Sequence, residues 1–362
     1  PLREVLGIVT KDFFNARRQR LDVNALPQPD ISVFDQNLFM HDGFIKGYHR
    51  IYTSRGCPGH CTFCDWKVFG QKISEYDIKE VVTDIKKRRD KFGITSFTIA
   101  DDCFTANPDR VFEFCGLIKG LNVNWRANSR ANLVTEKMLQ AMKDSGCHSV
   151  MLGLESGDPE TLRKIAKGVS LEDNIRAPKL AHKVGLEVYC CLMTGFPWET
   201  PDHVENQLKF VHELWDDVTL FQVSGSLMPF PGAAIYRQYA AQFGFEKYWL
   251  RPDYQNFSVQ IYQNAANPFK VSTFYQRNLF DDMYIQEEYF FKYSPEYKRA
   301  VKKLVREIGR HNLPFMFKGQ PLKQKLCWFL SNLSLGVSGV FPHLEKTVVG
   351  ALFHGRSKVE EV

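Results

Sequence analysis

The sequence predicts an α/β fold, a partial TIM-like (β/α)6 barrel followed by a mainly helical C-terminal extension. Three observations lead to this prediction. Six short β-rich runs recur along the chain, an amphipathic helical pattern follows each run, and capping residues mark helix ends. Parallel neighbouring strands need crossover helices, so a series of such units favours a parallel sheet that closes or nearly closes. With 362 residues, of which 44% are hydrophobic, the chain can bury the core that this fold needs.

The expected strands are residues 49–54, 96–100, 123–127, 148–155, 186–194 and 218–225. The helix signals between them are local. Asn107-Pro108 and Thr200-Pro201 each place an N-cap residue before a proline at the first helical position. Barrels of this kind carry their chemistry at the carboxyl ends of the strands, which is where a functional site is expected.

The chain divides into three parts by pattern. Residues 1–45 hold the Pro-rich connector LPQPD at 26–30 and look like the tail of an upstream unit with its linker. Residues 46–245 carry the repeated strand–helix units. Aromatic residues dominate after that point, so residues 246–362 are expected to form a mainly helical extension packed on the barrel.

Charge and composition exclude several classes of protein. The net charge of +6 suits anionic small molecules, and no run of five or six Lys or Arg points to a nucleic-acid partner. The sequence contains no uncharged apolar stretch of 18 residues, so no integral membrane segment is predicted. No signal peptide is recognised either. Nine cysteines, an odd number with three clustered, favour a metal site in a reduced cytoplasm over a disulfide framework.

The densest chemical signal is TSRGCPGHCTFCDW at 53–66, where Cys57, Cys61 and Cys64 have the spacing C-x3-C-x2-C. A structural zinc site needs four ligands, so zinc would require a distant fourth residue. The candidates for that fourth zinc ligand are His60, Cys103 and Cys115. A 4Fe–4S cluster held by three thiolates instead leaves one iron open to a substrate or cofactor.

The cysteine spacing resembles the signature of the radical S-adenosylmethionine (radical SAM) enzymes, with Phe63 as the aromatic before the last cysteine. The resemblance implies a 4Fe–4S cluster on Cys57, Cys61 and Cys64, with S-adenosylmethionine chelated to the open iron. In that family one electron from the cluster cleaves a sulfur–carbon bond. A 5′-deoxyadenosyl radical results and takes hydrogen from an unreactive carbon.

The resemblance extends over roughly residues 45–240 and implies cofactor-binding residues at other strand ends. Asp101 and Asp102 stand where the family contacts the methionine amino group, although a helix-capping pair is the alternative. Arg130 matches a recurrent arginine after the third strand. Glu155 and Ser156 match the end of the fourth strand, which approaches the cofactor's sugar and carboxylate.

The segment MTGFPWET at 193–200 resembles the family's turn after the fifth strand. Gly195 permits close approach of the backbone to the adenine, and the resemblance implies Glu199 as a further cofactor-binding residue. Trp198 stands where the family often has glycine, a departure from the family pattern.

One branch of the family matches further, because the LPQPD connector leads into SRGCPGHCTFC. In that branch a cobalamin-binding domain precedes the barrel. We therefore expect residues 1–45 to be the tail of such a unit, which fits a chain that opens on Pro1 rather than Met. The resemblance implies a cobalamin-dependent methyltransferase acting on an unactivated carbon. Two alternatives stay open: a radical cyclase or oxidoreductase without methyl transfer, and a zinc-stabilised, non-catalytic binding module.

The resemblance also implies partners. An external one-electron reductant of the flavodoxin or ferredoxin type would supply the electron. The substrate is expected to be a small molecule, hydrophobic or planar, because Tyr248, Trp249, Tyr254 and Phe257 lie close together in the extension. An ordinary core is the alternative explanation for these aromatic residues.

Overall fold

A six-stranded parallel sheet is the centre of the computed structural model, which describes residues 2–16, 18, 20–26, 29–33, 49–65, 72–252 and 290–316. The strand order is β1-β4-β5-β6-β7-β8, every pair is parallel, and β1 and β8 are the outer strands. The strands are β1 (His49–Ile51), β4 (Ser96–Ile99), β5 (Asn124–Arg130), β6 (Cys147–Glu155), β7 (Glu187–Thr194) and β8 (Leu220–Ser226). The partial (β/α)6 barrel predicted from the sequence is therefore confirmed.

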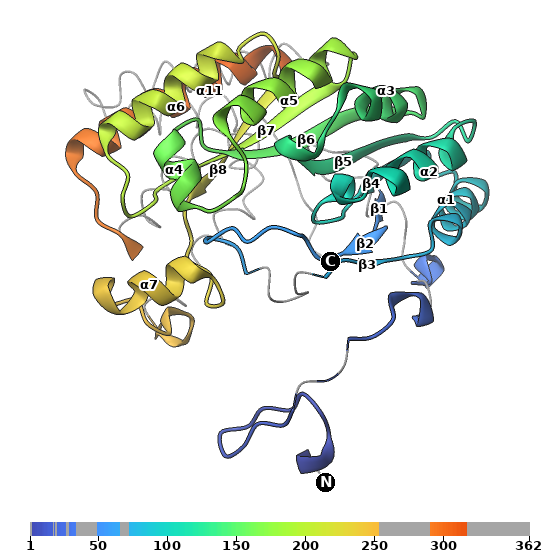
Figure 1. Ribbon diagram of the computed structural model, residues 1–362, viewed down its shortest axis with the longest axis horizontal. Coiled ribbons are helices and arrows are strands. Elements are labelled where there is room, and N and C mark those ends of the chain that lie inside the picture. The colour runs from blue at the N-terminus through green and yellow to red at the C-terminus, as the bar shows by residue number, and fades with distance from the viewer. Residues whose placement is uncertain are drawn as a thin grey trace, which may run out of the picture.

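Helices connect the strands and cover one side of the sheet (Figure 1). The helices between the strands are α1 (Ile78–Phe92), α2 (Pro108–Ile118), α3 (Glu136–Asp144), α4 (Pro159–Lys164), α5 (Leu171–Lys183) and α6 (Pro201–Glu213). Two further helices, α7 (Ala234–Phe243) and α11 (Pro295–Met316), follow the last strand. Short 3-10 turns include η6 (Phe104–Ala106), η7 (Ala131–Leu133) and η8 (Tyr248–Leu250). A sheet face covered by crossover helices is buried and therefore carries apolar side chains, while the carboxyl ends of the strands stay open for a site.

The helix starts follow the predicted capping chemistry. The Asn107 side chain accepts a hydrogen bond from the Arg110 amide, with Pro108 at the first helical position of α2. The Thr135 side chain caps α3 through the Met138 amide. These caps satisfy backbone N–H groups that have no partner inside the helix, so sequence alone fixes where these helices begin.

The first predicted strand is shorter in the structure than in the sequence-based prediction. β1 ends at Ile51, and Ser54–Arg55 form β2, which pairs antiparallel with β3 (Ser74–Glu75). Thr53 leaves the sheet because its amide and hydroxyl both donate to the Asp101 carboxylate. The chain therefore turns out of the sheet just before the cysteines.

Packing between the sheet and α2 is dominated by aromatic rings. Trp125 on β5, Phe104 and Phe114 meet edge to face, with ring centroids 5.2–5.6 Å apart. Trp125 and Phe114 are fully buried, and the Trp125 indole N–H donates to the Ser145 carbonyl. Large buried rings with a satisfied polar atom anchor the β4–β5 half of the sheet.

Helix α11 confirms the helical character of the C-terminal extension in its described part. It packs against α6 and β8 (Figure 1). The Asn312 side chain accepts from the Phe221 amide at 3.0 Å and donates to the Phe221 carbonyl at 2.7 Å. A side-chain amide thus replaces a missing neighbouring strand at the outer edge of the sheet. Tyr254 and Phe257 lie outside the described residues.

The N-terminal part is built differently from the barrel. Between residues 2 and 33, the described segments contain 3-10 turns, η1 (Leu2–Glu4), η2 (Val23–Ala25) and η3 (Ile31–Val33), and an isolated bridge from Val9 to Phe14. Asn24 joins this region to the barrel through the Glu75 carbonyl and the Asp77 amide. The domain boundary near residue 45 falls outside the described residues and stays a prediction.

None of the helices in the part of the chain that the structure describes is long and apolar enough to cross a bilayer.

Candidate active site

The cysteine loop, residues 56–65, lies at the carboxyl end of the sheet and joins distant elements. At its start the Gly56 amide donates to Asp102, which follows β4, at 3.1 Å. Further along, the Thr62 amide donates to the Ile165 carbonyl at the end of α4, and the Thr62 carbonyl accepts from the Ile235 amide of α7. The loop therefore runs from the β1 side of the sheet to the α4 side (Figure 1).

Cys57, Cys61 and Cys64 differ in their surroundings. Cys61 is buried, Cys57 is half-buried and Cys64 is exposed. The Cys103 thiol, followed by the Gly59 amide, lowers the pKa of Cys57 to about 6. Partial desolvation and then the neighbouring Cys61 raise the pKa of Cys64 to about 11. Like charges that are close together resist joint ionisation, and Cys57 and Cys64 differ in acidity within one loop.

Two donors point at the sulfurs of the loop. The Gly59 amide donates to Cys57 Sγ at 3.4 Å, and Arg130 Nη1 donates to Cys61 Sγ at 3.7 Å. A Cβ on Gly59 would lie 2.5 Å from Arg130 Nη1, so the absent side chain lets the guanidinium reach the loop. Thiolates that accept such hydrogen bonds fit iron–sulfur ligation, in which each cysteine binds a separate iron.

The residues considered for zinc lie in different surroundings. Cys115 is buried in the core under α2, where burial raises the pKa of its thiol to about 11. Cys103 is buried beside Cys57, and His60 is exposed. Within the described ranges, no three His, Cys, Asp or Glu side chains are arranged around a single metal-ion position.

The two adjacent aspartates have different partners. Asp101 is buried and accepts from the Thr53 amide at 2.6 Å, the Thr53 hydroxyl at 2.5 Å and the Ser54 hydroxyl at 2.8 Å. Burial raises the pKa of Asp101 against these hydrogen bonds. Asp102 is exposed beside Gly56 at the start of the cysteine loop. Asp101 thus holds the β1 end in place, and Asp102 is the carboxylate that a bound molecule can reach.

Arg130 and Glu155 meet through one loop, residues 165–168. Arg130 Nη2 donates to the Lys167 carbonyl, and Lys167 Nζ lies 2.8 Å from Glu155 Oε1. The Lys167 and Glu155 side chains are only 6% and 12% exposed, so each charge needs the other. Glu155 has a φ of +63°, rare for a residue with a side chain, at an irregularity where β6 pairs with β7. The backbone directs this carboxylate away from the usual strand orientation.

Ser156 is buried and structural in its contacts. Its hydroxyl accepts from the Asp158 amide at 3.0 Å, and its carbonyl accepts from the Asn174 side chain at 3.0 Å. Ser156 therefore fixes the turn between β6 and α4, directly after Glu155.

The turn at 195–199 is tightly hydrogen-bonded. Gly195 has a φ of +83°, a conformation that favours glycine. The Glu199 carboxylate accepts from the Gly195 amide at 2.8 Å and the Phe196 amide at 3.2 Å. Burial raises the pKa of Glu199 to about 7, although these donors and the Tyr297 hydroxyl act in the opposite direction.

Aromatic contacts connect this turn with the cysteine loop. The Phe63 and Phe196 rings meet edge to face at 6.3 Å, and Phe196 stacks on Trp198 at 5.1 Å. Lys164 Nζ lies 5.3 Å from the centre of the Trp198 ring. Trp198, the departure from the family pattern, thus packs between the turn and α4.

Sequence reasoning missed Lys167, Tyr293 and Tyr297. The Tyr297 hydroxyl donates to Glu199 at 2.6 Å, and the Tyr293 hydroxyl donates to the Gly195 carbonyl. Local patterns cannot pair residues about a hundred positions apart. The Ser294-Pro295 helix start does signal the helix that carries Tyr297, with Tyr293 two residues before it, but not what the two tyrosines contact.

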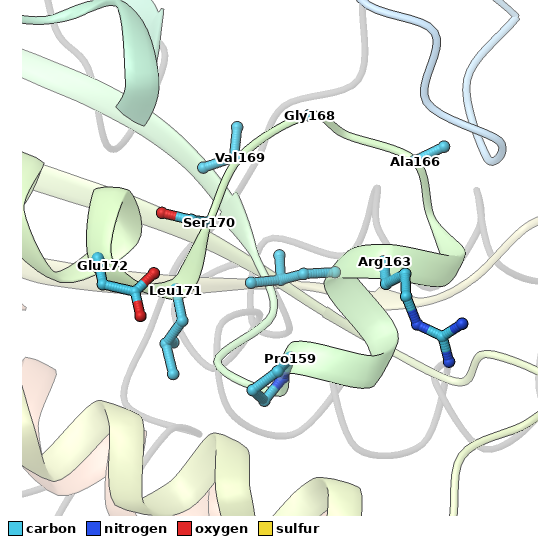
Figure 2. Close-up of a pocket in the computed structure, with 9 residues that line it drawn as sticks. Pro159, Arg163, Ala166, Gly168, Val169, Ser170, Leu171 and Glu172 are labelled. Carbon is cyan, nitrogen blue, oxygen red and sulfur yellow. The ribbon is translucent and has the colours of Figure 1, made fainter.

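A cavity of about 610 Å³ lies beside this region, between α4 and α5 (Figure 2). It is lined by Pro159, Leu162, Arg163, Ala166, Gly168, Val169, Ser170, Leu171 and Glu172. Its lining includes Ala166 and Gly168 of the loop at 165–168, whose Lys167 contacts both Arg130 and Glu155. The cysteine loop bonds the same segment, through the Thr62 amide and the Ile165 carbonyl.

Comparison with known proteins agrees with this geometry. Residues 51–211 match the sequence profile of the radical SAM superfamily. The chain is 33% identical over 243 residues to an uncharacterized methyltransferase of Pyrococcus horikoshii, covering 65% of this chain and 52% of the relative. It is 34% identical over 152 residues to cytidylyl-2-hydroxyethylphosphonate methyltransferase of Streptomyces wedmorensis, covering 41% of this chain and 28% of the relative. The chain thus spans about half or less of these curated relatives.

Among solved structures, the fold is similar to OxsB, a cobalamin-dependent S-adenosylmethionine radical enzyme solved with aqua-cobalamin and S-adenosylmethionine. The TM-score is 0.59 at 16% identity, covering 93% of this chain and 56% of that chain. At this identity the similarity concerns the fold alone. The matched profile region includes Cys57, Cys61 and Cys64, which lie at the carboxyl end of the parallel sheet. The match to the radical SAM superfamily therefore covers residues 51–211, the part of the chain that holds the three cysteines and runs from the end of β1 through β7.

Proposed function

We propose that this chain is the catalytic core of a radical SAM enzyme that serves the cobalamin-dependent methylation of an unactivated carbon. One observation carries the proposal. Three cysteines sit in a loop at the carboxyl end of a parallel sheet, and Arg130 and the Gly59 amide donate to two of their sulfurs. Backbone and side-chain donors aimed at thiolates are what an iron–sulfur cluster uses to set its potential.

Cys57, Cys61 and Cys64 would hold a 4Fe–4S cluster with one iron free for S-adenosylmethionine. The bound cluster and S-adenosylmethionine together supply a carbon-centred radical that removes hydrogen from an unreactive carbon. Arg130 stabilises negative charge on the Cys61 sulfur and fixes the loop against residue 167. Cys61 is buried, so its side of a bound cluster would be shielded from water.

The remaining predicted residues would hold S-adenosylmethionine. Asp102 would accept from its ammonium group, since the Asp101 carboxylate is occupied by Thr53 and Ser54. Glu155, oriented by Lys167, would face its polar groups. The backbone turn at Gly195 would contact the adenine, while Phe63 packs this turn against the cysteine loop.

Methyl transfer is supported by the relatives, two of which are named methyltransferases. Cobalamin is supported by the fold similarity to a cobalamin-dependent radical enzyme and by the connector at 26–30. We expect a small-molecule substrate, a flavodoxin- or ferredoxin-type reductant and a cytoplasmic setting. Residues 1–45 would be the tail of a cobalamin-binding-like unit with its linker.

The test is a co-product assay. The protein is reconstituted anaerobically with iron, sulfide and cobalamin, then given reductant and S-adenosylmethionine, and both 5′-deoxyadenosine and S-adenosylhomocysteine are quantified. Cys57→Ala removes a proposed cluster ligand. Cys115→Ala is the matched control, because Cys115 lies on α2 away from the loop.

Both co-products from the wild type and the control, and neither from Cys57→Ala, would support the methyltransferase. 5′-Deoxyadenosine alone would instead indicate a radical cyclase or oxidoreductase. If a preparation shown to carry about four irons per chain gives neither product, the catalytic proposal is wrong. A colourless protein with about one zinc would favour the binding module.

A further inference from the structure

The first turn of helix α11 contacts the turn at 195–199 through Tyr297. The Tyr297 hydroxyl donates to Glu199 Oε2 at 2.6 Å and accepts from the Gly195 amide at 2.8 Å. The Tyr293 hydroxyl donates to the Gly195 carbonyl, and the two tyrosine rings stack at 4.5 Å. Both backbone polar groups of Gly195 are therefore engaged, the amide by Tyr297 in the first turn of α11 and the carbonyl by Tyr293 just before the helix.

The network is closed and buried. Glu199 Oε2 also accepts from the Gly195 and Phe196 amides, so one carboxylate oxygen collects three donors. Tyr297 is 1% exposed, and Gly195 and Phe196 are buried. Polar groups buried in such a network rigidify the backbone that they contact, because losing one partner leaves the others unsatisfied.

The helix that carries Tyr297 is itself anchored. Near its carboxyl end, Asn312 pairs with both backbone groups of Phe221 on β8. Between these ends, Lys303 lies 3.2 Å from Glu205 on α6, and Val301 and Leu304 are buried. The Tyr297 hydroxyl is therefore presented from a fixed helix, and the Tyr293 ring stacks on the Tyr297 ring.

From this geometry we infer that α11 sets the conformation of the 195–199 turn for S-adenosylmethionine, with Tyr297 as the positioning residue. The inference rests on the proposed function, which assigns the turn to the adenine. Tyr297 does not need to touch the cofactor. It holds Gly195 in its left-handed conformation before binding, so less ordering remains to be done when the cofactor arrives. A part of the chain outside residues 51–211 would thus contribute to cofactor affinity.

The test compares Tyr297→Phe with Tyr189→Phe. Tyr297→Phe removes the hydroxyl and keeps the stacked ring. Tyr189→Phe is the matched control, since Tyr189 lies on β7, bonds Glu187 and packs against Phe315 of α11, away from the turn. Hydrogen exchange of residues 193–200 is measured in cluster-free protein. Affinity for S-adenosylmethionine is then measured by equilibrium dialysis of the iron–sulfur-loaded protein.

We expect Tyr297→Phe to speed exchange at 193–200 and to weaken S-adenosylmethionine binding about three- to tenfold, the range of one net hydrogen bond. The control should match the wild type in both measurements. Unchanged affinity in Tyr297→Phe, with a wild type that binds, would overturn the positioning role while leaving the proposed function standing. A loaded wild type that does not bind S-adenosylmethionine would overturn the proposed function, and the positioning role with it.

Discussion

The adjacent carboxylates Asp101 and Asp102, just after β4, are expected to have different roles, the first in stability and the second in cofactor binding. Asp101 accepts three hydrogen bonds from Thr53 and Ser54 while buried. Asp101→Ala would leave the buried Thr53 amide unsatisfied and lower the free energy of unfolding by about 2–4 kcal/mol. Asp102 is exposed, so Asp102→Ala should cost less than about 1 kcal/mol but weaken S-adenosylmethionine binding.

Urea unfolding and equilibrium dialysis on the two variants measure both effects. If Asp102→Ala binds S-adenosylmethionine as well as the wild type does, the assignment of Asp102 to the ammonium group is wrong. If Asp101→Ala is as stable as the wild type, the buried network at Thr53 does not hold the end of β1 in place.

Glu199 gives the turn a pH dependence whose sign follows from its surroundings. Burial raises its pKa in the folded protein from 4.5 to about 7. Below pH 4.5 both folded and unfolded states are protonated. Between pH 4.5 and 7 only the unfolded state ionises, so stability falls as the pH rises, by roughly 2–3 kcal/mol by pH 8. Glu199→Gln cannot ionise and should lack this loss.

Urea unfolding of wild type and Glu199→Gln at pH 4.5, 6 and 8 measures this contribution. The difference in the free energy of unfolding between the two proteins should shift steadily in favour of the glutamine variant as the pH rises. The values at pH 4.5 serve as the internal reference, because the glutamate is then neutral in the folded protein and only about half ionised in the unfolded chain. A difference that stays constant from pH 4.5 to 8 would mean that Glu199 ionises alike in both states.

At the scale of elements, α11 takes the place of a seventh strand at the outer edge of β8. Asn312→Leu keeps the side chain's size but leaves the buried Phe221 amide and carbonyl without their partner. We expect the free energy of unfolding to fall by about 2–4 kcal/mol and residues 219–223 to exchange faster. Arg310→Ala on the same helix is the control, since Arg310 is 72% exposed and should change stability by less than about 1 kcal/mol. Equal losses in the two variants would contradict the edge-pairing role of Asn312.

The elements show which features the sequence could predict. The six strands of the parallel sheet, the helices between them and caps such as Asn107 are local features, and these were predicted with small boundary errors. β1 is shorter than predicted because Asp101, almost fifty residues away, takes up the Thr53 amide. Tyr297 was missed for the same reason, as its partner Glu199 is remote in sequence. Local patterns report secondary structure, whereas side-chain networks depend on which elements the fold brings together.

For the molecule as a whole, the cysteine loop connects the first strand with elements formed much later in the chain. Gly56 bonds Asp102 after β4, while Thr62 bonds Ile165 at the end of α4 and Ile235 in α7. Fixing the loop with iron and sulfide should therefore slow hydrogen exchange in three places together: residues 53–65, 162–168 and 233–237. The unfolding midpoint should also rise, because a ligand bound only by the folded state stabilises it.

Removing the iron with a chelator should reverse all three changes, and Cys57→Ala should show none of them. The three segments are expected to respond together because a loop tied at both ends transmits its ordering to both supports. If iron slows exchange in 53–65 but leaves 162–168 and 233–237 unchanged, the hydrogen bonds of Thr62 do not couple the loop to the α4 side. In that case iron orders only the β1 half of the site, and Glu155 and Gly195 keep the conformations that Lys167 and Tyr297 set without iron.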